Sequence, residues 1–254
     1  MIIAQISDSH ILAPDSDDPA QPLRANAVTA VVRDINNLAD RPDLVIHTGD
    51  LVQHRTLSAY RFLRDLLSDL KVPCFLVPGN RDDRHMMADV FPRVAVYDHP
   101  ESFIHYTIDD YPVRLIAMDS QGLTSFKGHF SKARLDALAR AMAVDTSRPT
   151  ALFMHHPPFE ISNARDPFQY ETRQSVSDLE TLLSRHANIV RIFCGHSHRA
   201  RRDHLGGVEA CTIPSLAPDL RQDIYHPRFN DVAVYQTHHW HDRHGFLSVT
   251  RIAR

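Results

Sequence analysis

Short apolar runs that end in polar side chains place the strongest constraint on how this chain folds. Such runs cover residues 2–6, 43–47, 74–77, 150–154 and 189–194. They are nearly continuous in hydrophobicity, as expected for strands that are covered on both faces. Between them, apolar residues recur at steps of three and four over about 23–39 and 57–70, which predicts amphipathic helices. The alternation indicates an α/β fold.

The second half of the chain predicts a different mixture. Residues 103–108 and 113–118 form a predicted hairpin around Asp109-Asp110-Tyr111-Pro112. Helices are expected from an N-cap at Ser131 to about residue 143, and over 177–186. From about residue 208 onward the pattern is β-rich, with strands expected over 208–213, 231–237 and 246–252. We expect one domain over residues 1–254, with two packed sheets flanked by helices.

Composition excludes several classes of partner. The 254 residues carry 28 Lys and Arg against 31 Asp and Glu, so no nucleic-acid polymer is expected as a partner. No run approaches the roughly 18 apolar residues that span a bilayer, so no membrane partner is expected. The first ten residues lack the basic start of a secretion signal, and the three cysteines are sparse, which together favour a cytoplasmic location.

The polar clusters that follow the apolar runs contain residue types that bind metals. The ends of parallel strands gather at one edge of a sheet, so clusters far apart in sequence are expected to converge. We expect the i, i+2 pairs to point to one side because they lie in extended backbone. Imidazole, carboxylate and amide oxygen are ligands of Zn, Fe and Mn. The candidates are Asp8, His10, Asp50, Asn80, His155, His196 and His198.

Seven candidate ligands exceed what one four-coordinate site needs. They suit two ions that share a bridging carboxylate. Such a pair stabilises the attacking and leaving oxygens of a displacement at phosphorus and lowers the pKa of a bridging water.

Five blocks of this sequence, in order, resemble those of the calcineurin-like metallophosphoesterases. They are DSH (8–10), GD (49–50), GNRD (79–82), MHHPP (154–158) and GHSH (195–198). Their spacing and the HHPP block are most similar to the branch with class III cyclic-nucleotide phosphodiesterases and bacterial glycerophosphodiesterases. The resemblance covers about residues 1–215. It implies a four-layer α/β/β/α sandwich with two mixed sheets, and by analogy a homo-oligomer, a dimer or higher.

The same resemblance implies a function and a set of ligands. A metal-bound hydroxide would hydrolyse a small phosphodiester of the cyclic-nucleotide or glycerophosphodiester type. Two divalent or mixed-valent ions of Fe, Mn or Zn would be the cofactors. The first ion would be held by Asp8, His10, Asp50 and His198; the second by Asp50, Asn80, His155 and His196, with Asp50 bridging.

Two positions depart from the family pattern. The usual GNHD block places a His near the leaving group, whereas this chain has Arg81, which can stabilise negative charge but is a poor proton donor. A further active-site His usual near residues 214–218 is missing from the sequence there. Asn80, Arg81 and His156 are the predicted catalytic residues, with His156 either supporting the ligands or contacting substrate.

Arg81 keeps two other functions open. GNRD also occurs in UDP-diacylglucosamine pyrophosphohydrolases of the same superfamily, so a pyrophosphohydrolase of a nucleotide-linked substrate is the alternative enzyme. Some members of the fold have lost catalysis and act as binding scaffolds. These usually lose ligands, whereas all seven ligand positions are filled in this chain.

Overall fold

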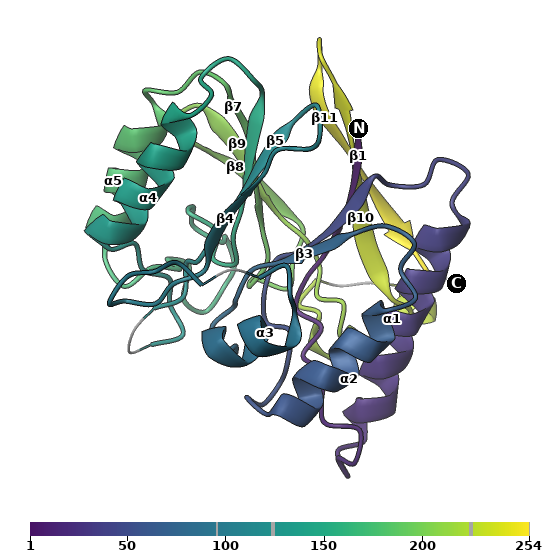
Figure 1. Cartoon of the computed structure of the whole chain (residues 1–254). Helices are drawn as coiled ribbons and strands as arrows, with labels where there is room; N and C mark the ends of the chain where they lie inside the picture. The colour runs from purple at the N-terminus through teal and green to yellow at the C-terminus, as the bar shows by residue number, and fades with distance from the viewer. Residues whose placement is uncertain (95, 123–124, 224–225, 254) are drawn as a thin grey trace.

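Two mixed sheets form the centre of the computed structural model, which describes residues 1–94, 96–122, 125–223 and 226–253 (Figure 1). In the first sheet the order is β11-β10-β1-β2-β3. Strands β1, β2 and β3 are parallel, whereas β10 runs antiparallel to both β1 and β11. The strands are β1 (Ile2–Ile6), β2 (Leu44–His47), β3 (Cys74–Leu76), β10 (Val234–His241) and β11 (Gly245–Ile252).

The second sheet has a parallel centre with antiparallel edges. Its order is β4-β5-β6-β7-β9-β8. The central four strands are parallel, and β4 and β8 pair antiparallel to their neighbours. The strands are β4 (His105–Ile108), β5 (Arg114–Met118), β6 (Thr150–Phe153), β7 (Ile189–Cys194), β8 (Arg201–Leu205) and β9 (Val208–Thr212).

Helices cover the outer face of each sheet (Figure 1). Three lie on the side of the first sheet: α1 (Ala20–Asn37), α2 (Leu57–Leu67) and α3 (Arg84–Val90). Two lie on the side of the second: α4 (Lys132–Ala143) and α5 (Arg173–Leu183). Short 3-10 turns occupy Pro218–Leu220 and Pro227–Phe229.

The apolar clusters follow these layers. One packs α1 and α2 on the first sheet, one packs α4 and α5 on the second, and one fills the space between the sheets. Alternate side chains of a strand point to opposite faces, so Leu44 and Ile46 enter the cluster between the sheets and Val45 enters the helix-facing cluster. The predicted four-layer α/β/β/α sandwich is confirmed.

Apart from the two 3-10 turns, one helix and one strand were not predicted from the sequence. Helix α3 begins at the N-cap Asp83, whose carboxylate accepts from the amides of His85 and Met86. It is only seven residues long, too short for a clear apolar period. Strand β8 is largely exposed, and four of its five residues are charged or polar, so it lacks an apolar pattern. The other predicted strands and helices are present, with ends shifted by a few residues.

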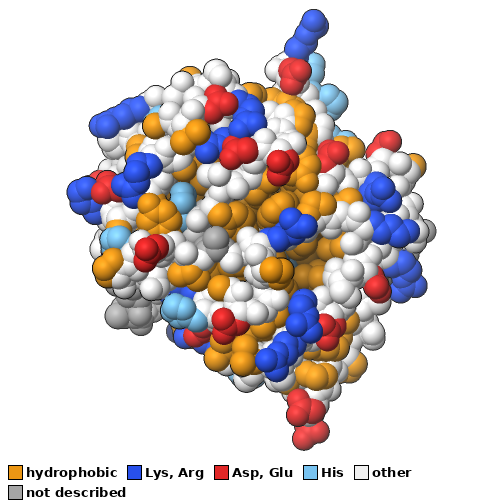
Figure 2. Space-filling view, viewed as in Figure 1, with side chains coloured by type: hydrophobic (Ala, Val, Ile, Leu, Met, Phe, Trp, Pro, Cys, Tyr) orange, Lys and Arg blue, Asp and Glu red, His pale blue; other side chains and the backbone are white. Residues whose placement is uncertain are grey.

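Lys and Arg side chains alternate with Asp and Glu over the viewed face (Figure 2). Among the described residues, no helix combines the length and hydrophobicity needed to cross a bilayer.

Strand β4 carries a histidine whose titration affects stability. Burial lowers the pKa of His105 to about 4 from an ordinary 6.5, and its Nε2 makes no hydrogen bond to the described residues. Between pH 6.5 and 4 the unfolded chain binds a proton that the folded chain does not, so stability falls as the pH falls through this window.

We therefore expect His105→Phe to remove part of the acid sensitivity. The phenyl ring keeps the edge contacts with Tyr97 and Phe103. Relative to the variant, the wild type should lose about 2–3 kcal/mol of unfolding free energy between pH 7 and 4, measured by urea denaturation. His204→Phe, on exposed β8, is the control. If the unfolding free energies of His105→Phe and the wild type change equally with pH, His105 is not the source of this acid sensitivity.

Candidate metal centre

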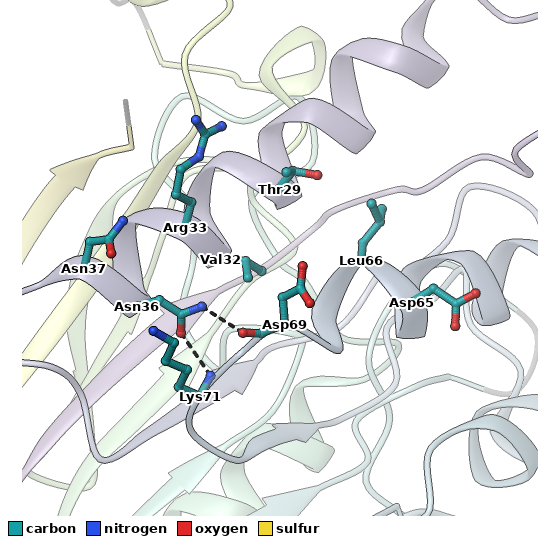
Figure 3. A pocket seen from close by; sticks show the side chains of 9 residues that line it. All are labelled: Thr29, Val32, Arg33, Asn36, Asn37, Asp65, Leu66, Asp69 and Lys71. Atoms are coloured by element: carbon teal, nitrogen blue, oxygen red, sulfur yellow. Dashed lines mark hydrogen bonds between the residues drawn. The ribbon is translucent and has the colours of Figure 1, made fainter.

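Five loops that follow strands converge on one site, and together they contain all seven predicted ligands. The loops follow β1, β2 and β3 of the first sheet and β6 and β7 of the second. The predicted convergence of strand ends is therefore observed. A hollow of about 540 Å³ between α1 and α2 is lined by other residues and contains none of the predicted ligands (Figure 3).

Four of the side chains form one compact group. The Nε2 atom of His198 lies 3.2 Å from Asp8 Oδ1 and 3.2 Å from His10 Nε2. Asp50 Oδ2 lies 3.6 Å from His10 Nε2. Ligand atoms of these four residues all lie within 4.8 Å of one another. This is the set that the family resemblance implies around the first ion.

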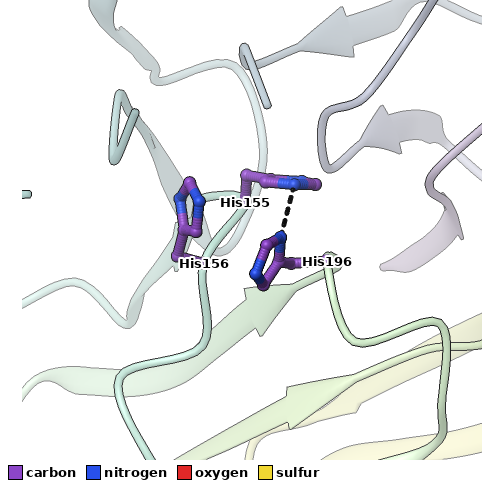
Figure 4. A group of neighbouring side chains, drawn as sticks. All are labelled: His155, His156 and His196. Atoms are coloured by element: carbon purple, nitrogen blue, oxygen red, sulfur yellow. Dashed lines mark hydrogen bonds between the residues drawn. The ribbon is translucent and has the colours of Figure 1, made fainter. Parts of the chain in front are cut away.

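The second predicted set adjoins the first through Asp50. The Nε2 atom of His155 lies 3.6 Å from Asp50 Oδ1, 3.1 Å from Asn80 Oδ1 and 3.2 Å from His196 Nδ1. Figure 4 shows a ring nitrogen of His155 and one of His196 pointing toward each other, with the two rings edge to face. The two oxygens of the Asp50 carboxylate thus point to different histidines, His10 on one side and His155 on the other.

Oxygen acceptors outside the cluster determine which nitrogen of three imidazoles carries the proton. The Nδ1 of His155 lies 2.7 Å from the carbonyl oxygen of Thr48. The Nδ1 of His198 lies 2.8 Å from the carbonyl of Leu220, and the Nδ1 of His10 lies 3.1 Å from Oε1 of Gln53. A carbonyl oxygen only accepts, so each Nδ1 carries the donated proton and each neutral ring presents an Nε2 lone pair to the cluster.

These lone pairs face other acceptors. In the neutral rings, His10 Nε2 and His198 Nε2 are two acceptors only 3.2 Å apart, and His155 Nε2 faces the acceptor Asn80 Oδ1 at 3.1 Å. Asp8 Oδ1 is buried without a hydrogen bond of good geometry. Acceptors that converge without donors repel one another, and a cation between them removes the repulsion. The residues present therefore fit metal ions.

Burial and mutual repulsion keep His10 and His196 in the ligand form, whereas His198 differs: burial alone would lower its pKa, but the Asp8 carboxylate raises it. Burial and the neighbouring imidazoles hold the pKa of His10 and His196 well below the ordinary value. Burial alone would raise the pKa of Asp8, but the charge of His198 and the other histidines lowers it below its usual range. Burial raises the pKa of Asp50, so a carboxylate there is costly unless positive charge lies nearby.

The backbone at five predicted ligands is left-handed. The φ angles are 54° at Asp8, 45° at His10, 51° at Asp50, 66° at His196 and 53° at His198. This region is uncommon for residues other than glycine and costs about 1 kcal/mol or more per residue. The expectation that the i, i+2 pairs converge through extended backbone is therefore wrong: they converge because each pair lies in a tight loop with left-handed residues.

Asp82 connects two of the ligand-bearing loops. Its carboxylate accepts from the amide of Leu51 at 3.1 Å and from the amide of Gly79 at 2.8 Å, and the hydroxyl of Tyr60 donates to it. Burial and the nearby Asp50 raise the pKa of Asp82 to about 7. The loops that carry Asp50 and Asn80 are thus held together by Asp82, the last residue of the GNRD block.

Arg81 lies at the edge of the cluster. Its amide donates to Asp50 Oδ1 at 2.8 Å, and its guanidinium lies 5.6 Å from the centre of the Phe126 ring. Phe126 is 65% exposed, which is unusual for so large an apolar side chain. Phe126 was not predicted as part of the site, because an isolated aromatic residue in a loop carries no ligand signal.

His156 is beside the ligands, but both of its ring nitrogens are engaged by protein atoms. Its Nδ1 lies 2.9 Å from the Ser120 hydroxyl, and its Nε2 lies 3.0 Å from the Phe126 carbonyl. Its ring centre lies 4.4 Å from that of His196 (Figure 4). This arrangement favours support of the site over direct contact with substrate.

The segment that lacks the family's extra histidine still reaches the site. The hydroxyl of Ser215 donates to the carbonyl of Asp8 at 2.8 Å, and the amide of Leu216 donates to the carbonyl of Ser7. The segment therefore helps to hold the left-handed loop after β1.

Comparison with known proteins agrees with this geometry. The model of the calcineurin-like phosphoesterase family matches residues 1–200, so this chain belongs to the calcineurin-like phosphoesterases. The resemblance and the class of enzyme predicted from the sequence, a hydrolase of phosphoric esters, are thereby confirmed.

Particular relatives lie in the predicted branch. The chain is 32% identical over 218 residues to glycerophosphodiester phosphodiesterase GpdQ of Enterobacter lignolyticus, covering 85% of this chain and 77% of that protein. It is 25% identical over 219 residues to the 3′,5′-cyclic adenosine monophosphate phosphodiesterase CpdA of Escherichia coli, covering 86% and 77%. A dimetal phosphatase from Danio rerio shares the fold, with a TM-score of 0.74 at 13% identity over 100% of this chain and 99% of that one.

Proposed function

We propose that this protein is a dinuclear metal-dependent phosphodiesterase that hydrolyses a small phosphodiester of the cyclic-nucleotide or glycerophosphodiester type. The observation that carries the proposal is the convergence of imidazole lone pairs and carboxylate oxygens around Asp50. The similarity to GpdQ and CpdA supports a diester as the substrate.

The proposed ligands divide into two sets that share Asp50. Asp8, His10 and His198 would complete the first, and Asn80, His155 and His196 the second. Nitrogen and oxygen donors of this kind suit Fe, Mn or Zn. Two such ions supply Lewis-acid chemistry, polarising phosphoryl oxygens and lowering the pKa of water.

The residues around the ligands orient them and stabilise charge. The Arg81 amide holds Asp50 in place, and the acceptors on Nδ1 hold three imidazoles with Nε2 inward. The Arg81 guanidinium stays protonated throughout, so it stabilises negative charge that develops on the departing oxygen without donating a proton.

Metal analysis and a pair of chromogenic esters test the proposal. The purified protein is expected to bind up to two ions per chain when titrated with Mn or Zn. It should hydrolyse bis(p-nitrophenyl) phosphate faster than p-nitrophenyl phosphate. A preference for the monoester at saturating metal would overturn the diesterase assignment, and a chain that binds no metal and stays inactive would support a binding scaffold.

Arg81 favours a second candidate, a pyrophosphohydrolase of a nucleotide-linked substrate. A phosphate leaving group needs less protonation than an alkoxide, and a fixed positive charge suits it. Turnover of a UDP-sugar or a dinucleoside polyphosphate, without turnover of cyclic AMP or a glycerophosphodiester, would favour this candidate.

We expect Arg81→His to change the dependence of rate on the leaving group. Imidazole can donate a proton whereas guanidinium cannot, so the variant should gain relative rate for diesters with poorly acidic alcohols. The slope of log kcat against leaving-group pKa measures this, and metal content should be retained because the amide of residue 81 still donates to Asp50. An unchanged slope would count against any role of residue 81 at the departing oxygen.

A further inference from the structure

A small hollow opens beside the proposed metal centre on the His196 side. It has a volume of about 170 Å³, and His196 and Ser197 form part of its wall. Arg165, Arg199, Gln169 and Gln222 also line it. Because His196 belongs to both the hollow and the ligand cluster, an alcohol arm of a diester bound at the cluster can extend directly into the hollow.

Two arginines of this hollow have no carboxylate partner among the described residues. The run 199–202 contains three arginines, and the structure separates them. Arg201 pairs with Asp223 at 2.9 Å and Arg202 with Glu209 at 3.7 Å, whereas Arg199 makes no ion pair with any described residue. Arg165 likewise has no ion pair within the described ranges. Arg199 is also partly buried, so its charge is screened by solvent less than that of an exposed side chain.

The acidic residue of the hollow does not cancel this charge. Asp166 forms an ion pair with Lys127 at 2.7 Å, which leaves the hollow with a surplus of positive charge. A second hollow of about 220 Å³ lies beside Asp82, and it is lined by Asp83 and Glu101 as well. Of its two arginines, Arg84 is paired with Asp119 at 2.5 Å, and Arg55 donates to the carbonyls of Asn80 and Arg81. The three carboxylates of this wall outnumber the two arginines. An anionic group is therefore favoured on the His196 side and disfavoured on the Asp82 side.

We propose that this hollow, with Arg199 and Arg165, binds an anionic group, a carboxylate or a phosphate, on one arm of the diester. The proposal rests on the proposed function and specifies its substrate class: a small phosphodiester with a second negative charge. Arginine donates two parallel hydrogen bonds to such a group, while the glutamine side chains offer further polar contacts.

A pair of matched substrates tests the subsite. p-Nitrophenyl 3-carboxypropyl phosphate and p-nitrophenyl butyl phosphate share a leaving group and differ chiefly in the carboxylate. For the wild type, KM for the carboxylate diester should be about tenfold or more below that for the butyl diester, as expected for a charge-assisted hydrogen bond. kcat should differ less, because the leaving group is the same.

Variants separate the contribution of Arg199 from general charge. Arg199→Ala should bring the ratio of the two KM values close to one, and Arg199→Lys should retain part of it. Arg202 lies three residues after Arg199, and its side chain is already paired with Glu209. Arg202→Ala therefore removes the same charge but should leave the ratio of the two KM values as in the wild type. Thermal denaturation followed by circular dichroism checks that each variant is folded.

The outcomes distinguish the subsite from the enzyme assignment. If bis(p-nitrophenyl) phosphate is hydrolysed but the wild type does not prefer the carboxylate diester, the subsite is wrong and the phosphodiesterase stands. Equal loss of preference in Arg199→Ala and Arg202→Ala would also overturn the subsite, since it would reflect general charge. If neither diester nor bis(p-nitrophenyl) phosphate is hydrolysed at saturating metal, the proposed function itself fails.

Discussion

Asp50→Asn is expected to lower kcat for bis(p-nitrophenyl) phosphate by about three orders of magnitude, equivalent to about 4 kcal/mol of transition-state stabilisation. The two Asp50 oxygens point to His10 and His155, each at 3.6 Å. The amide removes a negative charge between the two proposed ions, so binding of at least one should weaken. The backbone should persist, because Asn tolerates the left-handed φ of 51°.

Stability measurements make the cause of that loss clear. Burial raises the pKa of Asp50, so in metal-free protein its ionised form opposes folding. Metal-free Asp50→Asn should therefore be at least as stable as metal-free wild type, while elemental analysis shows fewer ions bound. Asp34→Asn, which alters a carboxylate that accepts from Tyr235 on the α1 side, is the matched control and should keep metal and activity. Retention of two ions with activity within tenfold of wild type would refute the bridging role.

Phe193→Ala is expected to lower the unfolding free energy by about 3–5 kcal/mol. Phe193 lies on β7, is fully buried and belongs to the cluster between the sheets. Its ring centre lies 4.6 Å from that of His238 and 5.3 Å from that of Phe246, both in the first sheet. Truncation leaves a cavity where the two sheets meet, and a densely packed interior fills it only partly.

Urea denaturation and a thermal melt measure this effect. For a chain of this size the melting temperature should fall by roughly 10 °C. Leu247→Ala on β11 removes an apolar side chain that is 52% exposed, and it should cost less than about 1 kcal/mol. If the two variants lose similar stability, the packing between the sheets is not what Phe193 supports. Because Phe193 lies three residues before His196, metal affinity should also weaken in Phe193→Ala.

Much of the fold is determined by local patterns in the sequence. Apolar runs covered on both faces predicted the parallel strands, and the N-cap Ser131, whose hydroxyl accepts from the amide of Arg134, marked the start of α4. Short or exposed elements such as α3 and β8 escaped prediction because they carry little periodic hydrophobicity. The single domain and the homo-oligomer stay predictions.

The identities of the candidate ligands came from the sequence alone, because residue type and position at a strand end are local properties. The geometry of these ligands could not be derived from the sequence. The Ser215 hydroxyl that holds the left-handed loop at Asp8, the carbonyl of Thr48 that sets the His155 tautomer and the ring of Phe126 beside Arg81 are contacts between segments far apart in the chain. A sequence does not show which side chain a backbone carbonyl contacts or which charged side chain lacks a partner. The packing of the two sheets brings these groups together. In the same way, only the tertiary structure shows that Arg201 and Arg202 have carboxylate partners, whereas Arg199 has none among the described residues.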